Sequence, residues 1–137
     1  MQVNELRIGS LVYFNGKHQE TGVVSGITTD LITDPKIYIN DRIDIPYNLS
    51  SLRPIKINNQ WLSDCGFVLQ HVTTHTDGRY SEMYIKDCLW IRQQDNGLWS
   101  LFIFGYPITR FEDSQYKHQI QNTYFALTGE ELNLKNK

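Results

Sequence analysis

The residues best equipped for chemistry are two cysteines and four histidines, and one stretch brings several of them together in sequence. Cys65 precedes His71 and His75, which lie four residues apart, and Asp77 follows them. Structural zinc takes four nitrogen or sulfur ligands, usually supplied as two close pairs. Cys65 and Cys88 stand apart, with no CxxC motif. The sequence therefore predicts no metal site, and we interpret the two histidines as an exposed strand end before a turn.

Hydrolytic chemistry would need a nucleophile with a nearby base and an orienting acid. Cys65 and His71 are the only close pair of this kind, and a cysteine directly before a helix-stopping glycine, here Gly66, is more often packed than reactive. The chain has no Gly-x-Ser-x-Gly motif, no His-Glu-x-x-His motif and no nucleotide-binding glycine pattern. We predict a protein that is not an enzyme, uses no cofactor and keeps both cysteines reduced. A Cys- or metal-dependent enzyme is the alternative that these residues leave.

Two pairs of an arginine and an aromatic residue could line a cleft for a small ligand such as a nucleotide. Arg92 lies two residues from Trp90, and Arg110 directly precedes Phe111. A cation beside a ring is the combination that such a cleft requires. A small ligand is therefore one of the partners that the sequence allows.

A second basic set lies nearer the start of the chain and leaves nucleic-acid binding open as an alternative. Lys17, Arg42 and Arg53 could form a rim, and an exposed Tyr38 could stack on bases. The charge balance weighs against this alternative: thirteen Lys and Arg stand against fifteen Asp and Glu, and residues 1–56 contain six of each sign. Duplex binding depends instead on clustered positive charge.

The first part of the chain predicts a small antiparallel barrel of the SH3-like type over residues 1–54. Short apolar runs separated by turn residues are typical of such a barrel. Gly22 and Gly26 predict bulges or sharp bends. Pro46 and Pro54 predict that the chain leaves the sheet between them. The expected strands cover residues 6–8, 11–14, 21–27, 37–39 and 43–45.

Residues 55–137 predict an α+β unit, so that the whole chain is of the α+β class. Asn58 as N-cap and Gly66 as the stop indicate a two-turn helix. From residue 67 to 110 the pattern favours a meander of three or four strands. A C-terminal helix over residues 114–128 should cover it and end at Gly129. Its expected core-facing stripe comprises Tyr116, Ile120, Thr123, Tyr124 and Leu127.

A second stripe on the C-terminal helix has an unusual composition. His118, Gln121, Asn122 and Phe125 recur at the spacing of one helix face. Either the stripe packs in a seam between the two units, with its amides hydrogen-bonded inside, or it is a contact surface for a ligand, a partner or a second copy of the chain. The sequence leaves both readings open.

The apolar runs and the first residues bear on the cellular setting. The longest apolar runs contain four residues, such as residues 11–14, whereas a membrane-spanning helix needs about 20. Residues 1–5 show neither the basic nor the apolar part of a secretory signal. We expect a cytoplasmic protein with no membrane partner.

Three stretches of the sequence share a pattern with a known family: residues 4–12, residues 54–67, and residues 118–132, which read HQIQNTYFALTGEEL. On this pattern the chain resembles an uncharacterised family of small proteins from Bacteroidota and from their phages and mobile elements. The resemblance implies a phage or mobile-element setting and brings no activity, cofactor or site residue. With the residue patterns, it leads us to expect a non-enzymatic binding protein that engages a host protein or a small ligand.

Overall fold

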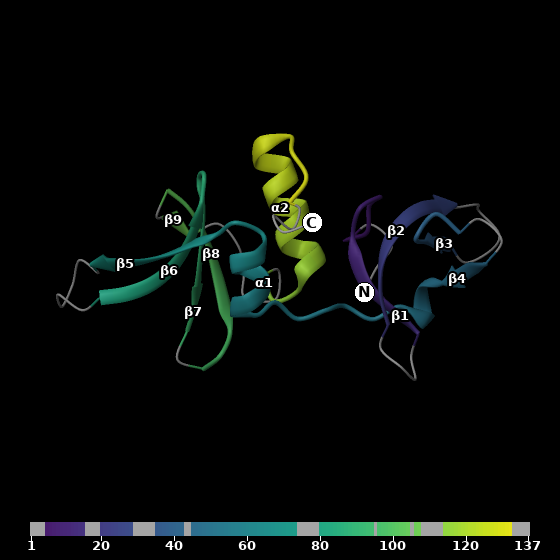
Figure 1. Cartoon of the computed structure of the whole chain (residues 1–137), viewed down its shortest axis with the longest axis horizontal. Coiled ribbons are helices and arrows are strands. Elements are labelled where there is room, and N and C mark those ends of the chain that lie inside the picture. Colours follow the sequence, from purple (N-terminus) through teal and green to yellow (C-terminus); the bar gives the residue numbers. More distant parts are fainter. Residues whose placement is uncertain are drawn as a thin grey trace.

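Two antiparallel β-sheets lie on either side of a C-terminal helix in the computed structural model of the chain (Figure 1). The structure describes residues 5–15, 20–28, 35–42, 45–73, 80–94, 96–104, 106–107 and 114–132. The predicted α+β class is therefore confirmed. Among the described residues, none of the helices has both the length and the apolar character that crossing a membrane demands.

The first sheet has the strand order β1-β2-β3-β4. Its side chains alternate, so that Ile37 and Ile39 of β3 are buried while Tyr38 is half-buried on the other face. The strands are β1 (Leu11–Asn15), β2 (Glu20–Thr28), β3 (Lys36–Ile39) and β4 (Pro46–Asn48), followed by the 3₁₀ helix η2 (Leu49–Ser51). Its core comprises Leu6, Val12, Val24, Ile37, Ile39 and Leu52.

The two glycines of β2 play different parts. Between Val24 and Gly26 the pairing of β2 with β3 shifts register, so the predicted irregularity at Gly26 is confirmed. Gly22 pairs regularly with β1. A Cβ atom at Gly22 would overlap the Ile39 side chain and lie 2.9 Å from Phe14 Cδ1. Gly22 is therefore required for close packing rather than for a bulge.

Two expectations for the first sheet are wrong. Residues 6–8 do not form a strand, because the chain turns there: Ser10 N donates to Arg7 O at 3.0 Å, and Gly9 has φ +101°. Pro46 does not end the sheet but begins β4, opposite Tyr38. A proline is tolerated there because β4 is an edge strand. The predicted strand 43–45 falls mainly on residues 43 and 44, which lie outside the described part.

The second sheet has five strands in sequential order rather than the three or four expected. They are β5 (Val68–Thr73), β6 (Tyr80–Lys86), β7 (Leu89–Gln93), β8 (Trp99–Ile103) and the short β9 (Tyr106–Pro107). Helix α1 (Asn59–Asp64) precedes them as predicted. Asn58 Oδ1 caps it by accepting from Trp61 N at 2.8 Å, and Gly66, at φ +92°, follows it.

Helix α2 (Lys117–Thr128) covers one face of the second sheet. The predicted core residues Ile120 and Tyr124 are buried, but Leu127 is 38% exposed, which corrects its assignment to the core. As expected, Gly129 ends the helix, with φ +74°. The shared core comprises Ile57, Trp61, Leu62, Cys65, Phe67, Leu89, Ile91, Trp99, Leu101, Ile120, Tyr124 and Leu132.

Helix α2 begins at Lys117, three residues later than predicted. The preceding residues are held by the second sheet instead: Ser114 Oγ donates to Trp99 O at 2.7 Å, and Gln115 Nε2 donates to the same oxygen at 2.9 Å. Gln119 Oε1 then accepts from Gln115 N and Tyr116 N, which caps the helix start. Tertiary hydrogen bonds thus override the local signal for an earlier start.

Candidate interaction site

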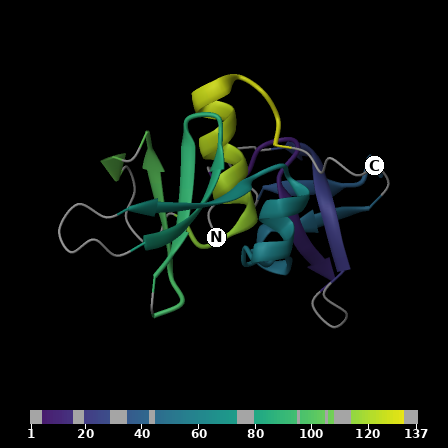
Figure 2. The same ribbon diagram turned by 60° about the vertical axis from the view of Figure 1, so that its left-hand side comes forward.

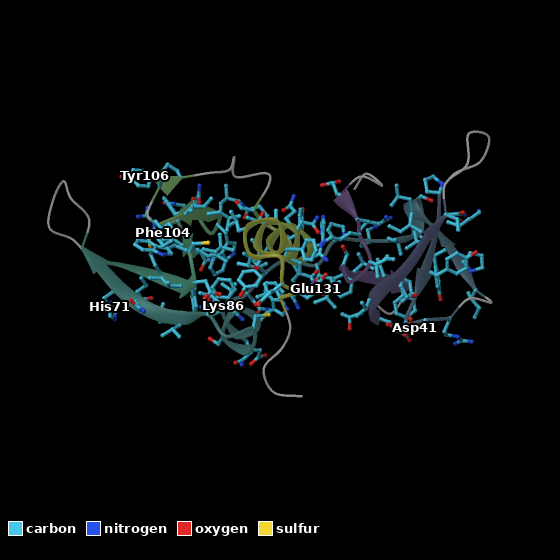
Figure 3. The ribbon with its side chains drawn as sticks, turned by 90° about the horizontal axis from the view of Figure 1, so that it is seen from above. Asp41, His71, Lys86, Phe104, Tyr106 and Glu131 are labelled. Carbon is cyan, nitrogen blue, oxygen red and sulfur yellow. The ribbon has the colours of Figure 1, made fainter. Side chains whose placement is uncertain are left out.

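The polar stripe of α2 lies against the first unit, and Gln121 makes its central contact. This side chain is 3% exposed. Its Oε1 accepts from Leu11 N at 2.9 Å, and its Nε2 donates to Gly9 O at 3.0 Å. Asn122 Nδ2 donates to Glu5 O at 2.7 Å. The amides of the stripe therefore lie within a seam between α2 and the N-terminal segment, seen along the helix in Figure 3.

Arg7 is the main cation of this seam, although no sequence pattern indicated it. Its Nε donates to Asn122 Oδ1 at 2.8 Å, and its Nη2 donates to Gln121 O at 3.0 Å. Its Nη1 forms an ion pair with Glu131. The guanidinium also lies 4.6 Å from the ring centroid of Phe125. An arginine followed by a turn gives no local signal of contacts with Asn122 and Gln121, which lie 115 and 114 residues away in sequence.

His118 is the most deeply buried polar residue of the stripe, with a side chain 1% exposed. Within the described part of the chain, neither ring nitrogen has a hydrogen-bond partner. Its Nε2 lies 4.0 Å from Glu5 Oε1, and its ring stacks on Tyr116. Burial lowers the pKa of His118, and the nearby Glu5 carboxylate opposes this shift. The seam therefore favours a neutral imidazole.

The face of the second sheet opposite α2 presents five apolar residues directly opposite one another across all five strands. Antiparallel pairing places Val68 against Ile85, Ile85 against Trp90, and Trp90 against Phe102. Phe102 in turn lies opposite Pro107. Directly paired residues share a face, and Leu89, Ile91 and Leu101 occupy the core face. We call Val68, Ile85, Trp90, Phe102 and Pro107 the apolar row.

The apolar row is partly exposed and extends about 19 Å across the sheet at the usual strand spacing. Val68 is 58% exposed at one end, and Pro107 is exposed at the other. Arg92 lies beside it, opposite Ser100, and therefore shares a face with Trp90 as the sequence suggested. Arg92 Nη2 donates to Gln94 Oε1 at 2.7 Å, which holds the guanidinium near the row.

Two aromatic side chains project from the turn between β8 and β9, near one end of the row (Figure 3). Phe104 is 67% exposed and Tyr106 is 76% exposed. Phe104 has φ +50°, a conformation that bulky residues rarely adopt. Its N donates to Cys88 O at 3.0 Å, which holds the turn. The glycine that follows Phe104 in the sequence is the signal that could have indicated this turn.

The other predicted binding residues are not brought into one cluster by the described contacts. Arg53 donates to Ser50 O and Leu52 O, at the end of η2. Tyr38 lies on β3, whereas Arg53 pairs with Tyr13 of β1. Arg42 follows β3 and is exposed. Lys17 and Arg110 lie outside the described residues.

Those residues considered for metal or covalent chemistry that the structure describes are not assembled either. Burial raises the pKa of the Cys65 thiol to about 11, which suits a packed side chain. His71 is exposed on β5, and His75 and Asp77 lie outside the described residues. No group of three or more metal-ligating side chains occurs in the described part of the chain. Cys65 therefore acts as a small core residue.

No family model matches the chain, and no curated protein or solved structure gives a significant match.

Proposed function

We propose that the chain is a non-enzymatic binding protein that docks a protein partner on the apolar row. The observation that supports this most directly is the row itself, five apolar residues in register on the sheet face opposite the core. Its two ends are exposed and its three central residues are half-buried, and contiguous apolar surface that reaches solvent marks interaction sites. Trp90 and Arg92 are also of the residue types that dominate binding energy at protein interfaces.

The shape of the row favours a protein over the other two partners considered. Small-molecule sites are concave and enclose most of their ligand, whereas this row extends across a whole sheet. A nucleic acid requires a basic track, and the only cation that the described pairings place beside the row is Arg92, which is bonded to Gln94. A helix or strand of a partner laid across the five strands fits its length.

We also propose that the first unit is an SH3-like barrel. The support is the order of its elements: η2 follows β4, and Arg53 then returns to β1. Arg53 pairs there with Tyr13. Tyr13 N donates to Arg53 O and Arg53 N donates to Tyr13 O, both at 2.9 Å. This pairing brings the end of the unit to its first strand. A cytoplasmic accessory protein of a phage or mobile element is the setting that we infer from the family resemblance.

Affinity capture from host lysate tests the docking proposal. We expect the wild-type chain to retain a protein partner that Ile85→Lys loses, because the new charge lies within the row, directly opposite Trp90. Leu127→Lys is the matched control: it adds the same charge at an exposed position of α2. Circular dichroism checks that both variants fold.

Three results would contradict the proposal. Equal retention by wild type and Ile85→Lys would place the partner elsewhere. Retention that nuclease treatment abolishes would support the nucleic-acid alternative. In that case Arg42→Glu should weaken the binding of nucleic acid. A retained mass of small-molecule size in native mass spectrometry, with no protein partner, would support the small-ligand alternative.

A further inference from the structure

Strand β5 is an unprotected sheet edge. It is the terminal strand of the second sheet and pairs with β6 along all six of its residues without a register shift. Its sequence VLQHVT contains no proline and no Asp, Glu, Lys or Arg. Natural proteins usually block such edges with charges, prolines, bulges or very short strands. None of these devices occurs in β5.

The other sheet edges in the described ranges are blocked. Strand β9 has two residues and ends with Pro107, and β4 has three residues and begins with Pro46. The free side of β1 is occupied by Arg53. Among the described strands and their described contacts, only β5 leaves a full row of backbone donors and acceptors available. Its side chains Val68, at 58% exposure, and Leu69, at 44%, are also uncovered.

We propose that β5 pairs with β5 of a second copy of this chain to form a continuous ten-stranded antiparallel sheet. The absence of charge favours this occupant, because two identical strands then place no like charges opposite one another. Antiparallel pairing about a two-fold axis satisfies the backbone groups of both copies in the same way. A strand of six residues offers about 20 Å of such pairing.

The symmetry has a consequence for the apolar row. A two-fold axis perpendicular to the sheet leaves each face on the same side, so the rows of both copies lie on one face of the ten-stranded sheet. Val68, at the β5 end of each row, lies at the junction. The dimer thereby presents two rows to one partner or to two, although the pairing itself does not depend on what the rows bind.

Leu69→Lys tests this pairing without touching the row, because Leu69 lies opposite Tyr84 on the α2 side of the sheet. We expect sedimentation velocity to give the wild type a mass of twice 16.1 kDa and Leu69→Lys a mass of 16.1 kDa. The matched control is Leu127→Lys, an equivalent change on α2, which should remain a dimer. Hydrogen exchange should show β5 amides protected in the wild type and released in Leu69→Lys.

Either of two results would overturn the proposal. One is a wild type that stays monomeric up to its solubility limit. The other is a dimer that Leu69→Lys leaves intact with unchanged β5 exchange, which would place the interface elsewhere. Because Ile85 lies outside β5, loss of partner capture by Ile85→Lys in a protein that still dimerises separates this proposal from the docking function.

Discussion

At the scale of single residues, the glutamines of the C-terminal segment substitute for missing backbone partners. Gln121 bonds both Leu11 N and Gly9 O, and Gln115 bonds both Trp99 N and Trp99 O. One side-chain amide thus supplies the acceptor and the donor that a neighbouring strand would supply. The sequence identified Gln121 as part of a buried or contacting stripe. It did not identify the partners, because these are backbone atoms about 110 residues away that have no residue signature.

His118 makes the stability of the fold depend on pH. Its pKa is lowered by burial, so the unfolded chain binds a proton at higher pH than the folded chain does. Stability should therefore be full above the ordinary value of 6.5 and fall as the pH drops from 6.5 towards the lower folded-state pKa. In His118→Leu the loss of stability below pH 6.5 should vanish. Urea unfolding at a series of pH values at and below 6.5 measures the unfolding free energy of both proteins.

His71→Gln is the control for the loss of one imidazole, because His71 is exposed on β5. The unfolding free energy of His71→Gln should change with pH as it does in the wild type. If the unfolding free energy of His118→Leu also changes with pH as in the wild type, another group is responsible for the pH dependence.

At the scale of elements, strands and caps were predictable where local patterns decide them. The strands that became β1, β2 and β3, the Asn58 cap and the Gly129 stop follow from alternation, turn residues and capping chemistry. The start of α2 and the exposed turn at Phe104 were missed. The first depends on hydrogen bonds to Trp99, which is distant in sequence, and the second on which rings the core has room to cover.

The two glycines of β2 should respond differently to an added methyl group. Gly22→Ala should cost about 1–3 kcal/mol of unfolding free energy, because the methyl would be forced against Ile39 and Phe14. Gly26→Ala should cost less than about 1 kcal/mol, because its nearest neighbour, Tyr38 Cδ2, lies at an ordinary 3.4 Å. Urea unfolding followed by circular dichroism compares the two. Equal costs would mean that the sheet relaxes around Gly22.

At the scale of the whole molecule, α2 belongs to both halves of the fold. It completes the second core through Ile120 and Tyr124, and it bonds the first unit through Gln121 and Asn122. Figure 2 shows the ribbon of this helix between the strands of the two sheets. The sequence predicted two units, 1–54 and 55–137, and the two core clusters fall on either side of that boundary. The apolar row was not predicted, because it depends on the register of five strands rather than on any one of them.

Arg7→Leu should loosen the seam while leaving each core intact. The change removes the hydrogen bonds to Asn122 and Gln121 and the ion pair with Glu131. We expect the Leu11 amide, which donates to Gln121, to exchange its hydrogen faster. The Tyr13 amide, bonded to Arg53 within the first unit, should exchange as before. Hydrogen exchange by NMR measures both amides.

Arg53→Leu is the matched control, because the Arg53 side chain bonds only carbonyls of its own turn among the described contacts. Arg53→Leu should leave the hydrogen-exchange rates of the Leu11 and Tyr13 amides unchanged. Unchanged Leu11 exchange in Arg7→Leu would show that the amides of α2 hold the seam without the arginine.

The contacts of Arg7 also set an order of events during protein synthesis. Its partner Asn122 is made 115 residues later. At translation rates of about 5–20 residues per second, that delay is roughly 6–23 s. The first sheet can form soon after residue 54 is made, but the backbone groups of Gly9 and Leu11 wait for Gln121 of α2. A nascent chain therefore presents the unfinished side of its first sheet to chaperones and to other chains until α2 has left the ribosome.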